Sequence, residues 1–545
     1  VYEQNSLYPN VAYTISEPMQ WRDVRVVELR LYPVRYNPQT AVLQHAGHFA
    51  VVINYEAATG SLARTSNATT PLSAGMASQI INAEQAAGWR HMPIDVAQPP
   101  SLGELSQPQQ VLGRSDLPLD NPTYKIEVNE DGIYEISGAA LQAAGMNLSS
   151  ATFASIEMMY RGETVAYDYT DGNGNGHLDA ADTIRFYGWA FNGPRLAAQY
   201  IVNNVFWLWA NGTSTHIDTV ANPTSGSTIT SFRDSLTTAP EETFFNTWTN
   251  RWDEFPNEPD AVYWKKIIKS NSSSNNNPGD YTVNLPNPAS GGAAANYTIE
   301  FMTRRTPVVN GIEQENSVEV TLNGNGNTGN VSWNGHRNVN LTDTIKSNEQ
   351  QDGTNVFDII ISTYIGGVTA EYYLNRITVE YTRDLIAVDD ELIFGGGSGS
   401  RIFVLSNFTT DNAVVWSITN PNEPDIGNMT GRTTGGTYRV GTSASEPQFI
   451  ATTEANIKSP ISVTEYTRSR LAPANCQNSE AACQVDWIAL THESLTSATN
   501  QLATYRATQN GGNYNTFVVQ YADIINQYGY GLPLPAAIQD YLRHT

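Results

Sequence analysis

The spacing of apolar residues along the chain changes near residue 485. Up to that point, short runs alternate between apolar and polar residues and are separated by Gly, Asn and Pro, which is the pattern of β-strands joined by turns. Beyond it, Asp486–Thr491 predicts a buried strand, and Ser494–Asn510 predicts a helix followed by Gly511. Phe517–Tyr521 predicts a second strand, and Pro535 opens a short helix. The chain is therefore predicted to be mainly β and to finish in α/β structure.

The predicted α/β part is incomplete. Its helix carries Leu495, Ala498, Leu502 and Tyr505 on one face, which is the spacing of an amphipathic helix. Two parallel strands cannot cover their own faces and edges, so we expect the rest of the sheet to lie beyond Thr545 or to come from a partner. Because α/β sheets carry their sites at the carboxyl ends of several strands, most of the chemistry of such a domain is expected outside these residues.

The patterns divide the chain into six predicted segments. They are 1–105, a β domain; 106–121, a linker rich in Pro, Gln and Ser; 122–256, a β-rich domain with a short helix; 257–385, a β-sandwich of jelly-roll type; 386–483, a further β domain; and 484–545, the truncated start of an α/β domain. Strands are expected at Tyr32–Pro38 and Phe49–Tyr55. The predicted fold is thus several β-sandwich or jelly-roll-like domains in series, followed by the incomplete α/β unit.

Two local signals stand out in the third segment. Asp131 and Gly132 lie between two alternating runs, which predicts a β-hairpin. Ser137 is expected to cap a short helix that ends at Gly145, since a hydroxyl before a helix and a glycine after it satisfy the free backbone groups at the two ends.

Composition and charge exclude some classes of function for this chain. The chain has 545 residues and a formal net charge of −24. A surface this acidic repels phosphate backbones, so we expect no nucleic-acid partner. The sequence contains no run of 18 apolar residues, so no membrane span is predicted. The chain begins without Met or a signal-peptide pattern, as a processed secreted protein would, and as an arbitrary fragment would too. We expect a secreted, extracellular or cell-surface protein.

The strongest local motif is a twelve-residue loop that resembles calcium-binding loops. Side-chain oxygens are expected from Asp171, Asn173, Asn175, Asp179 and Asp182, and a backbone carbonyl from His177. Gly176 occupies the sixth position, where such loops turn sharply. The final ligand is Asp instead of Glu, and only one carboxylate lies in the first half, which predicts modest affinity. We expect a structural Ca²⁺ site here; the alternative is an Asn/Gly-rich turn without metal.

Other candidate residues favour structural interpretations. Cys476 and Cys483 are either a local disulfide, which would suit an oxidising compartment, or two free thiols. His492 lies near Cys483 in sequence, but a structural role is favoured for both. Asp389 and Asp390 are expected in a solvated turn. Gly395–Gly397 is not followed by a helix signal, so a phosphate-binding loop is not expected.

Several stretches, taken in order, resemble one family. They are Tyr32–Pro38; Tyr124–Val128 with Asp131–Tyr134 and Ala143–Gly145; Asp182–Gly188; Asn204–Leu208; Val320–Gly324, Trp333–Gly335 and Gly353–Asn355; Trp416–Pro421; and Asp486–His492 with Gly529–Pro533, Pro535–Ile538 and Leu542. Together they resemble the gingipain family of cysteine peptidases (peptidase family C25), in its propeptide-like region, β-sandwich and the opening of its caspase-like domain. The resemblance implies a His–Cys dyad located beyond the second α/β strand. His492 and the two cysteines do not match that dyad, so these residues alone are expected to be inactive.

Two functions compete at this stage. The chain is expected to be the non-catalytic N-terminal region of a secreted, cell-surface gingipain-like endopeptidase, shielding or positioning its own catalytic domain or a processed fragment of it. The alternative is a structural or adhesive component of an extracellular surface assembly built from the same β modules. A weaker third interpretation is carbohydrate binding by the sandwich, with Trp264 and Trp333 stacking on sugars, although a core position is favoured for both.

Overall fold

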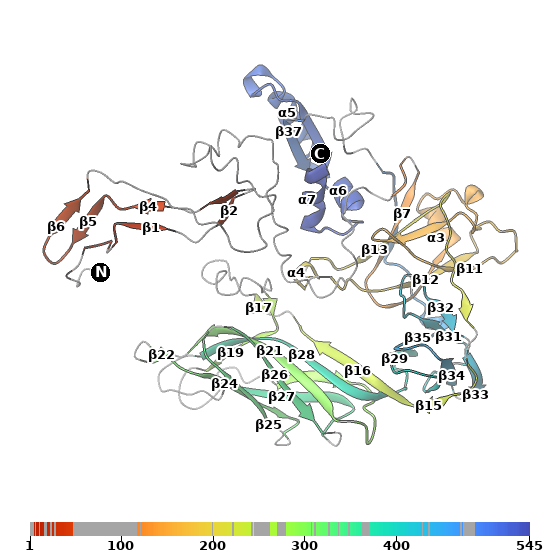
Figure 1. The fold of residues 1–545 in the computed structure, drawn as a ribbon. Coiled ribbons are helices and arrows are strands. Elements are labelled where there is room, and N and C mark those ends of the chain that lie inside the picture. The colour runs from red at the N-terminus through yellow and green to blue at the C-terminus, as the bar shows by residue number, and fades with distance from the viewer. Residues whose placement is uncertain are drawn as a thin grey trace. The chain divides into compact units, whose positions relative to one another are not determined.

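The structure is a computed structural model that describes parts of residues 5–46 and most of residues 117–544 (Figure 1). Residues 47–116, 245–261, 270–279, 362–369 and 472–484, with several shorter stretches, lie outside the described residues. The chain forms two compact units, Val1–Ser101 and Leu102–Thr545. The predicted strand at Phe49–Tyr55, most of the 106–121 linker, and the cysteines Cys476 and Cys483 fall outside the described residues.

The first unit contains antiparallel strand pairs. The pairs are β1 (Tyr13–Ile15) with β4 (Leu29–Leu31), β2 (Met19–Trp21) with β3 (Val24–Val26), and β5 (Val34–Asn37) with β6 (Val42–His45). The predicted strand at Tyr32–Pro38 is confirmed as β5. Pro33 and Pro38 bound it, because proline has no N–H to donate to a ladder. None of the side chains described for this unit is buried.

The second unit begins with two sheets around an aromatic-rich core. The larger sheet has the order β10 (Glu163–Thr164), β9 (Glu157–Tyr160), β13 (Asn204–Trp209), β7 (Thr123–Val128), β36 (Ser462–Tyr466), and the smaller has β11 (Asp168–Thr170), β12 (Thr183–Gly188), β8 (Gly132–Ser137). Phe206 and Leu208 of β13 point into this core, which also contains Tyr134 and Phe186. Every residue of β13 is buried, so the opposite face of the strand must be covered as well.

The predicted hairpin at Asp131 and Gly132 is wrong. β7 pairs with β13 and β36, whereas β8 pairs with β12 in the other sheet. A two-residue hairpin turn of the favoured type needs positive φ at both central residues, and neither Asp131 nor Gly132 has it. Gly132 serves close packing instead: a Cβ on it would lie 2.8 Å from Cδ of Lys458.

The predicted helix after Ser137 is confirmed as α3 (Gly138–Ala143). The backbone N–H of Ala140 donates to the Ser137 hydroxyl at 3.2 Å, and Gly145 has a φ of +109°. These are the capping interactions that the sequence predicts at the two ends.

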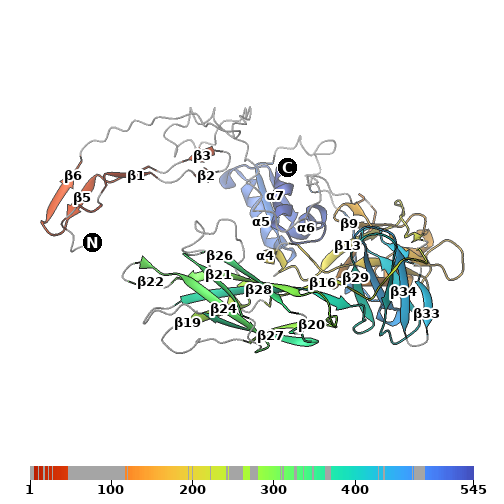
Figure 2. The ribbon, with the colours of Figure 1, turned by 60° about the horizontal axis from the view of Figure 1, so that its bottom comes forward.

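The next domain is a sandwich of two antiparallel sheets (Figure 2). One sheet has the order β16 (Ser231–Thr238), β28 (Ala370–Asp384), β21 (Ala295–Arg305), β26 (Asn338–Ile345), with β19 (Lys265–Lys269) also on β28; the other has β20 (Asp280–Leu285), β27 (Gly353–Ile361), β24 (Asn316–Leu322), β25 (Thr328–Trp333). Burial alternates residue by residue along β24 and β27, as strands with one face on a core require. The predicted sandwich is present.

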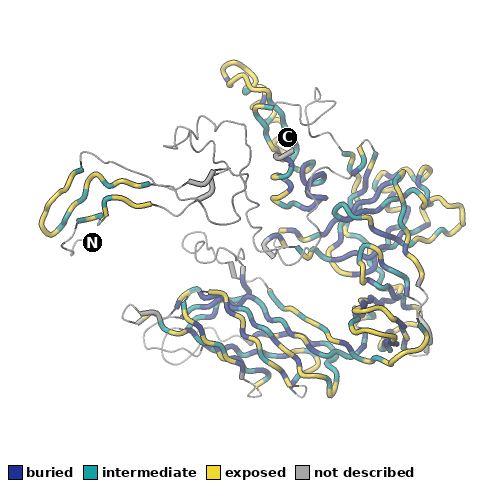
Figure 3. The backbone as a smooth tube through the Cα atoms, viewed as in Figure 1, coloured by how far each residue is buried: buried dark blue, intermediate teal, exposed yellow. Residues whose placement is uncertain are grey.

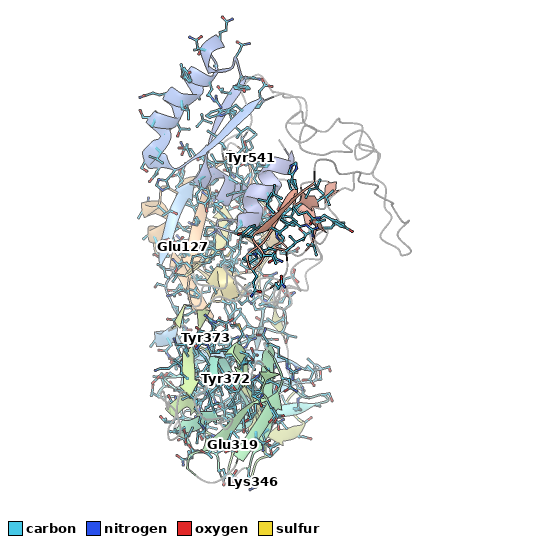
Figure 4. The ribbon with its side chains drawn as sticks, turned by 90° about the vertical axis from the view of Figure 1, so that its left-hand side faces the viewer. Glu127, Glu319, Lys346, Tyr372, Tyr373 and Tyr541 are labelled. Carbon is cyan, nitrogen blue, oxygen red and sulfur yellow. The ribbon has the colours of Figure 1, made fainter. Side chains whose placement is uncertain are left out.

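The two tryptophans of the sandwich belong to its core. Trp264 is 6% exposed and packs edge-on against Tyr281. Trp333 is 2% exposed, and its indole N–H donates to the Thr303 hydroxyl at 2.8 Å. It also contacts Tyr372, one of the β28 residues labelled in Figure 4. Neither indole is available to stack on a sugar, so the carbohydrate interpretation fails.

A third β domain has two sheets and a phenylalanine-rich core. The sheets have the orders β14 (Thr219–Val220), β32 (Asp425–Gly427), β31 (Ala413–Ser417), β35 (Gln448–Thr453), β29 (Glu391–Gly395), and β15 (Ser227–Ile229), β30 (Arg401–Leu405), β34 (Thr437–Thr442), β33 (Met429–Thr433). Strand pairing crosses the segment limits expected from the sequence. β14 and β15 join this domain, β16 joins the sandwich, and β36 returns to β7.

Ion pairs connect the first and third β domains. The Nε atom of Arg185 lies 2.6 Å from Glu135, and its Nη2 atom lies 2.8 Å from Glu454. Nζ of Lys458 lies 3.0 Å from Glu130 and 3.8 Å from Glu391. Burial raises the pKa of the Glu391 carboxyl, although Lys458 acts in the opposite direction. Lys458 therefore pairs mainly with Glu130, and the charge of Glu391 is poorly compensated.

The C-terminal α/β segment has the two predicted strands, but the first is not buried as predicted, since only Thr491 within it is buried. β37 (Trp487–Thr491) runs parallel to β38 (Thr516–Gln520), with η4 (Glu493–Leu495), α5 (Thr496–Arg506) and η5 (Gln509–Gly511) between them, and α6 (Tyr521–Tyr528) and α7 (Pro535–His544) after them. The predicted helix thus ends earlier than Asn510. Leu495, Leu502 and Tyr505 are 58%, 50% and 54% exposed, and α5 is largely yellow in Figure 3. Among the helices of the described residues, none is both long and apolar enough to cross a bilayer.

Candidate functional site at the junction of the β sheet and the α/β segment

The α/β segment has a small core of its own. α6 and α7 enclose Ile524, Ile525, Tyr528 and Tyr541, against Val519 of β38. The rings of Tyr528 and Tyr541 meet edge to face at 5.6 Å, a favoured arrangement of aromatic pairs. Tyr541, labelled in Figure 4, is fully buried, and its hydroxyl donates to the carbonyl oxygen of Leu471 at 3.3 Å. The helices are thereby fixed to each other and to the strand.

The loop between α6 and α7 packs the α/β segment against β13. The indole Nε1 of Trp207 donates to the backbone carbonyl of Tyr530 at 2.9 Å, and both residues are buried. The surrounding apolar cluster is formed by Leu117, Met159, Ala197, Ile201, Val205, Trp207, Trp209, Tyr530 and Leu532. This cluster covers the outer face of β13, which explains why the strand is buried on both faces.

Gly531 is required at the closest point of this contact. Its φ is +87°, and a Cβ on it would lie 2.7 Å from Cγ1 of Val205 and 3.2 Å from Cε of Lys125. Only glycine adopts that backbone conformation without cost and also leaves space for the neighbouring strand. The stretch Gly529–Pro533, which the sequence marks only as a family motif, forms the loop that contacts β13.

Polar contacts flank the apolar cluster. The Tyr466 hydroxyl, at the end of β36, donates to Oδ1 of Asp523 at 3.1 Å and accepts from Nε2 of Gln527 at 2.9 Å. Arg468 donates to Oε1 of Gln527 at 3.2 Å and to the Leu117 carbonyl at 3.1 Å. Burial, followed by the charge of Asp523, raises the pKa of the Tyr466 hydroxyl well above its ordinary value. Tyr466 is therefore a neutral hydroxyl at physiological pH and holds α6 through two hydrogen bonds.

The predicted calcium loop lies between β11 and β12. Oδ2 of Asp171 accepts from the N–H of Gly176 at 2.8 Å, and Oδ1 accepts from that of Gly174 at 2.7 Å. These backbone donors lower the pKa of the Asp171 carboxyl, with the Gly176 N–H as the largest cause. The amide nitrogens of Asn173 and Asn175 lie 2.7 and 2.9 Å from Oδ2 of Asp179. The side chains at the third, fifth and ninth positions thus contact one another, whereas the carboxylate at the first position binds backbone N–H groups.

The last predicted ligand has other partners. Asp182 is 2% exposed, and its two carboxylate oxygens accept from the N–H groups of Gly172 and Asp179. Within the described residues, no three His, Cys, Asp or Glu side chains are grouped as metal ligands. A cation here would therefore depend on the amide oxygens of Asn173 and Asn175, which requires their amide groups to rotate. His177 is placed by its backbone, which bridges to Thr152.

The other sequence candidates occupy structural positions. Nδ1 of His492 accepts from the N–H of Ser494 at 3.3 Å and so caps η4. Asp389 and Asp390 have positive φ in a tight turn, and Asp390 accepts from the N–H of Thr409 at 2.6 Å. Gly395–Gly397 is followed by a strand. His492, Asp389 and Asp390 thus make structural contacts within their own loops and turns.

Sequence reasoning missed the junction residues. No pattern marks Tyr466 or Trp207, because the contacts that give them a role span 57 and 323 residues of sequence. The helix α6 was also missed, although Ile524, Ile525 and Tyr528 have helical spacing. That spacing is the one local signal that could have found part of the site.

Comparison with known proteins agrees with this arrangement. Residues 1–87 match the propeptide model of family C25, and residues 480–545 match the model of peptidase family C25. Dimeric latent PorU from Porphyromonas gingivalis has a TM-score of 0.53 at 14% identity, covering 80% of this chain and 40% of that one. The chain thus spans about two fifths of the length of that structure. No curated protein sequence matches the chain.

Weaker similarities carry no argument. The cycloalternan-forming enzyme from Listeria monocytogenes has a TM-score of 0.16 at 8% identity, over 49% of this chain and 20% of that one. The VP2 subviral particle of infectious bursal disease virus also has a TM-score of 0.16, at 12% identity, over 74% of this chain and 90% of that one.

The chain thus has a match to a cysteine-peptidase propeptide at one end and a match to a cysteine peptidase at the other, with β domains between them. Residues 1–87 and 480–545 are therefore similar to the propeptide and to the peptidase of the gingipain family, peptidase family C25.

Proposed function

We propose that these residues are the non-catalytic N-terminal region of a secreted, cell-surface gingipain-like endopeptidase. In this proposal, the β scaffold holds the opening of the peptidase domain in place, and the residues that cleave peptide bonds lie beyond Thr545. The observation that carries the proposal is the contact between Trp207 and the Gly529–Leu532 loop, since that loop belongs to the region matched by the peptidase model. The chain's coverage of only two fifths of latent PorU supports the remainder lying elsewhere.

The mechanism proposed for the scaffold is positional. β37 and β38 are parallel, and a parallel sheet places catalytic groups at the carboxyl ends of its strands. A change in the orientation of β38 would therefore change the orientation of every strand that pairs beside it in the sheet. In this proposal two hydrogen bonds hold that orientation: the Trp207–Tyr530 bond holds the loop after α6, and the Tyr466–Asp523 bond holds α6 itself.

Two assays test the proposal. The chain alone, given generic peptide substrates under reducing conditions, should show no hydrolysis; hydrolysis that cysteine alkylation abolishes would contradict a non-catalytic role. In a longer protein that includes these residues and a C25 catalytic domain, Gly531→Val should lower peptidase activity, because the valine side chain would force the loop off β13. Gly291→Val, at a φ of +73° with no atom within 4 Å of the new Cβ, is the matched control and should leave activity intact.

We also propose that the loop Asp171–Asp182 binds one Ca²⁺ with a structural role. Asp171, Asn173, Asn175, Asp179 and the His177 carbonyl would hold the ion, and Asp182 would contribute after releasing one backbone donor. A bound Ca²⁺ supplies positive charge that neutralises the loop. Gly138 lies against this loop, because a Cβ on it would be only 2.0 Å from the Asp179 carbonyl oxygen. Ordering of the loop by Ca²⁺ would therefore also restrict the start of α3.

A further inference from the structure

The loop between β25 and β26 joins the two sheets of the sandwich and contains an Asn–Gly pair, Asn334–Gly335. Asparagine loses its side-chain ammonia most readily before glycine, because glycine has no Cβ to block the approach of its backbone nitrogen to the side-chain amide. The Asn334 side chain is exposed, and Gly335 has a φ of +72°. The pair is therefore accessible to the water and base that this reaction uses.

Neither reacting group of this pair is restrained. Among the described residues, the Asn334 side-chain amide has no hydrogen-bond partner, and the backbone N–H of Gly335 has none either. The pair contacts the core through the Gly335 carbonyl, which accepts from Nδ2 of Asn316 at 3.2 Å. The amide carbon of Asn334 and the nitrogen that attacks it can therefore meet without breaking a hydrogen bond of their own.

Other Asn–Gly pairs are restrained at the attacking nitrogen. In the pair Asn211–Gly212, the glycine N–H donates to the Ser155 carbonyl at 2.8 Å. In the pair Asn510–Gly511, the glycine N–H donates to the Thr508 carbonyl at 3.0 Å. The two pairs of the predicted calcium loop donate in the same way to the Asp171 carboxylate, at 2.7 and 2.8 Å. Each of these nitrogens must lose a hydrogen bond before it can attack.

The pair Asn323–Gly324 is restrained at the side-chain amide. Nδ2 of Asn323 donates to the Glu349 carbonyl and to Oδ1 of Asn355, both at 3.1 Å. Oδ1 of Asn323 accepts from the N–H of Val356 at 2.7 Å. Since both ends of the amide are bonded, the amide cannot turn toward the nitrogen of the next residue.

The pair Asn192–Gly193 is restricted by packing. A Cβ on Gly193 would lie 2.2 Å from Cζ of Phe191, so the phenylalanine ring lies directly against the glycine. The cyclic imide that forms during the loss of ammonia needs space beside the glycine, and this ring takes up part of it. Asn334–Gly335 is therefore the least restrained Asn–Gly pair within the part of the chain that the structure describes.

We propose that Asn334 is a site of spontaneous deamidation in the folded protein. The Gly335 nitrogen loses its proton to base and attacks Cγ of Asn334. The bond between Cγ and the side-chain nitrogen breaks, and that nitrogen takes up a proton from water and leaves as ammonia. Water then opens the cyclic imide at either carbonyl carbon, which gives isoaspartate or aspartate. The step needs no oxidant, reductant or enzyme, and it does not depend on the proposed peptidase role.

The product changes the connection between the two sheets. Isoaspartate directs the main chain through the former side chain, which adds a methylene group between Trp333 and Gly335, and the new carboxylate is ionised at neutral pH. Trp333 is fixed by its bond to the Thr303 hydroxyl, and the Arg337 carbonyl is fixed by the N–H of Thr303 at 3.1 Å. The extra length must therefore be accommodated at the Gly335 carbonyl, which weakens its bond to the buried Asn316.

The test is peptide mapping by mass spectrometry after the whole chain has been incubated at mildly alkaline pH, folded in buffer or unfolded in urea. Asn334 should convert in the folded chain at close to its rate in urea. Asn211, Asn323 and Asn510 should convert at least about tenfold more slowly in the folded chain than in urea, because their hydrogen bonds must open first. Fragmentation that separates isoaspartate from aspartate identifies the product.

Two variants isolate the effect of this site. Asn334→Gln should abolish the mass change at this position, because the longer side chain cyclises far more slowly. Asn340→Gln, at an exposed position of neighbouring β26, is the matched control and should leave the conversion of Asn334 unchanged. After incubation, wild type and Asn340→Gln should melt at a lower temperature than before, whereas Asn334→Gln should not change.

Three outcomes would contradict these expectations. Protection of Asn334 by folding that equals the protection of Asn323 would overturn the proposal. Faster conversion at another of the Asn–Gly pairs compared above would overturn it too, because the structure would then not determine the order of reactivity. A melting temperature that stays the same after Asn334 has converted would overturn the inferred effect on the sandwich.

Discussion

Gly531 lies so close to Val205 that a methyl group on its Cα would be 2.7 Å from the Val205 Cγ1 atom. Gly531→Ala combines this clash with a φ of +87° that alanine avoids. We expect a loss of about 1–3 kcal/mol, concentrated in α6 and α7. Hydrogen exchange of the buried α6 amides should accelerate, while exchange in the sandwich stays unchanged. Gly291→Ala is the strain-matched control, and equal acceleration in both variants would show that the contact with Val205 is unimportant.

Trp207→Phe tests the hydrogen bond and leaves the aromatic packing in place. The substitution removes the indole N–H that donates to the buried Tyr530 carbonyl, and losing such a buried hydrogen bond costs about 1–3 kcal/mol. Limited proteolysis should then cut between α6 and α7 faster than in wild type. An unchanged cleavage rate would mean that the apolar cluster alone holds the loop.

Tyr466→Phe should weaken the α6 contact in a pH-dependent way. At neutral pH the variant loses two hydrogen bonds, about 1 kcal/mol after solvent competition. The pKa of Tyr466 is raised in the folded state above its ordinary value of 10.0. Its stabilising contribution is therefore complete below pH 10 and is lost as the pH rises through the folded pKa. Urea unfolding at about pH 8 and about pH 11 should show the advantage of wild type over the variant shrinking at the higher pH; a constant difference would count against this account.

Glu391→Gln should stabilise the protein at neutral pH. The pKa of Glu391 is raised, with burial as the main cause, so the folded state favours the protonated carboxyl. Its contribution is full below the ordinary value of 4.5 and is lost as the pH rises through the raised pKa. We expect a gain of less than about 1 kcal/mol at pH 7, which disappears near pH 4, by differential scanning fluorimetry. Glu319→Gln, on the exposed face of β24 (Figure 4), is the control and should show no such trend.

Chelation of calcium should lower the melting temperature if the loop Asp171–Asp182 binds it. At a free Ca²⁺ concentration of about 100 times Kd, binding adds about 2.7 kcal/mol, which EGTA would remove. Asp171→Asn should abolish the response, and Asp411→Asn, at an exposed loop position with the same charge change, should keep it. Identical melting curves with and without EGTA in wild type would contradict the site.

The sequence predicted those elements that are determined by residues close together in the chain. The Ser137 cap, the glycine at 145, the alternation along β24 and the strands β37 and β38 all follow from patterns a few residues long. The hairpin prediction at Asp131 and Gly132 failed because β7 and β8 pair with strands of different sheets, which are distant in the sequence. Lys458, which donates to the Asp131 carbonyl, likewise lies more than 320 residues away.

The site was predictable only in part, for the same reason. Leu502 and Tyr505, on the predicted apolar face of α5, are exposed, whereas Ile524 and Tyr528 of the unpredicted α6 are buried. Periodicity shows that a helix has an apolar face, but the neighbours that cover that face are decided by tertiary contacts. The docking role of Gly531 likewise depends on Val205 and Lys125, which no local pattern connects to it.

The return of β36 to β7 has a consequence for biosynthesis. Ser462 pairs with Glu127, and Tyr466 pairs with Thr123, so the first sheet remains open at one edge until more than 330 further residues have left the ribosome. Sheets closed by such distant strands form slowly, because a long loop must be ordered before the pairing is gained. During that time β7 presents unpaired backbone groups, which are a template for aggregation. The chain is therefore expected to need chaperone protection of this edge, and the junction with the α/β segment can form only after Tyr530 has been synthesised.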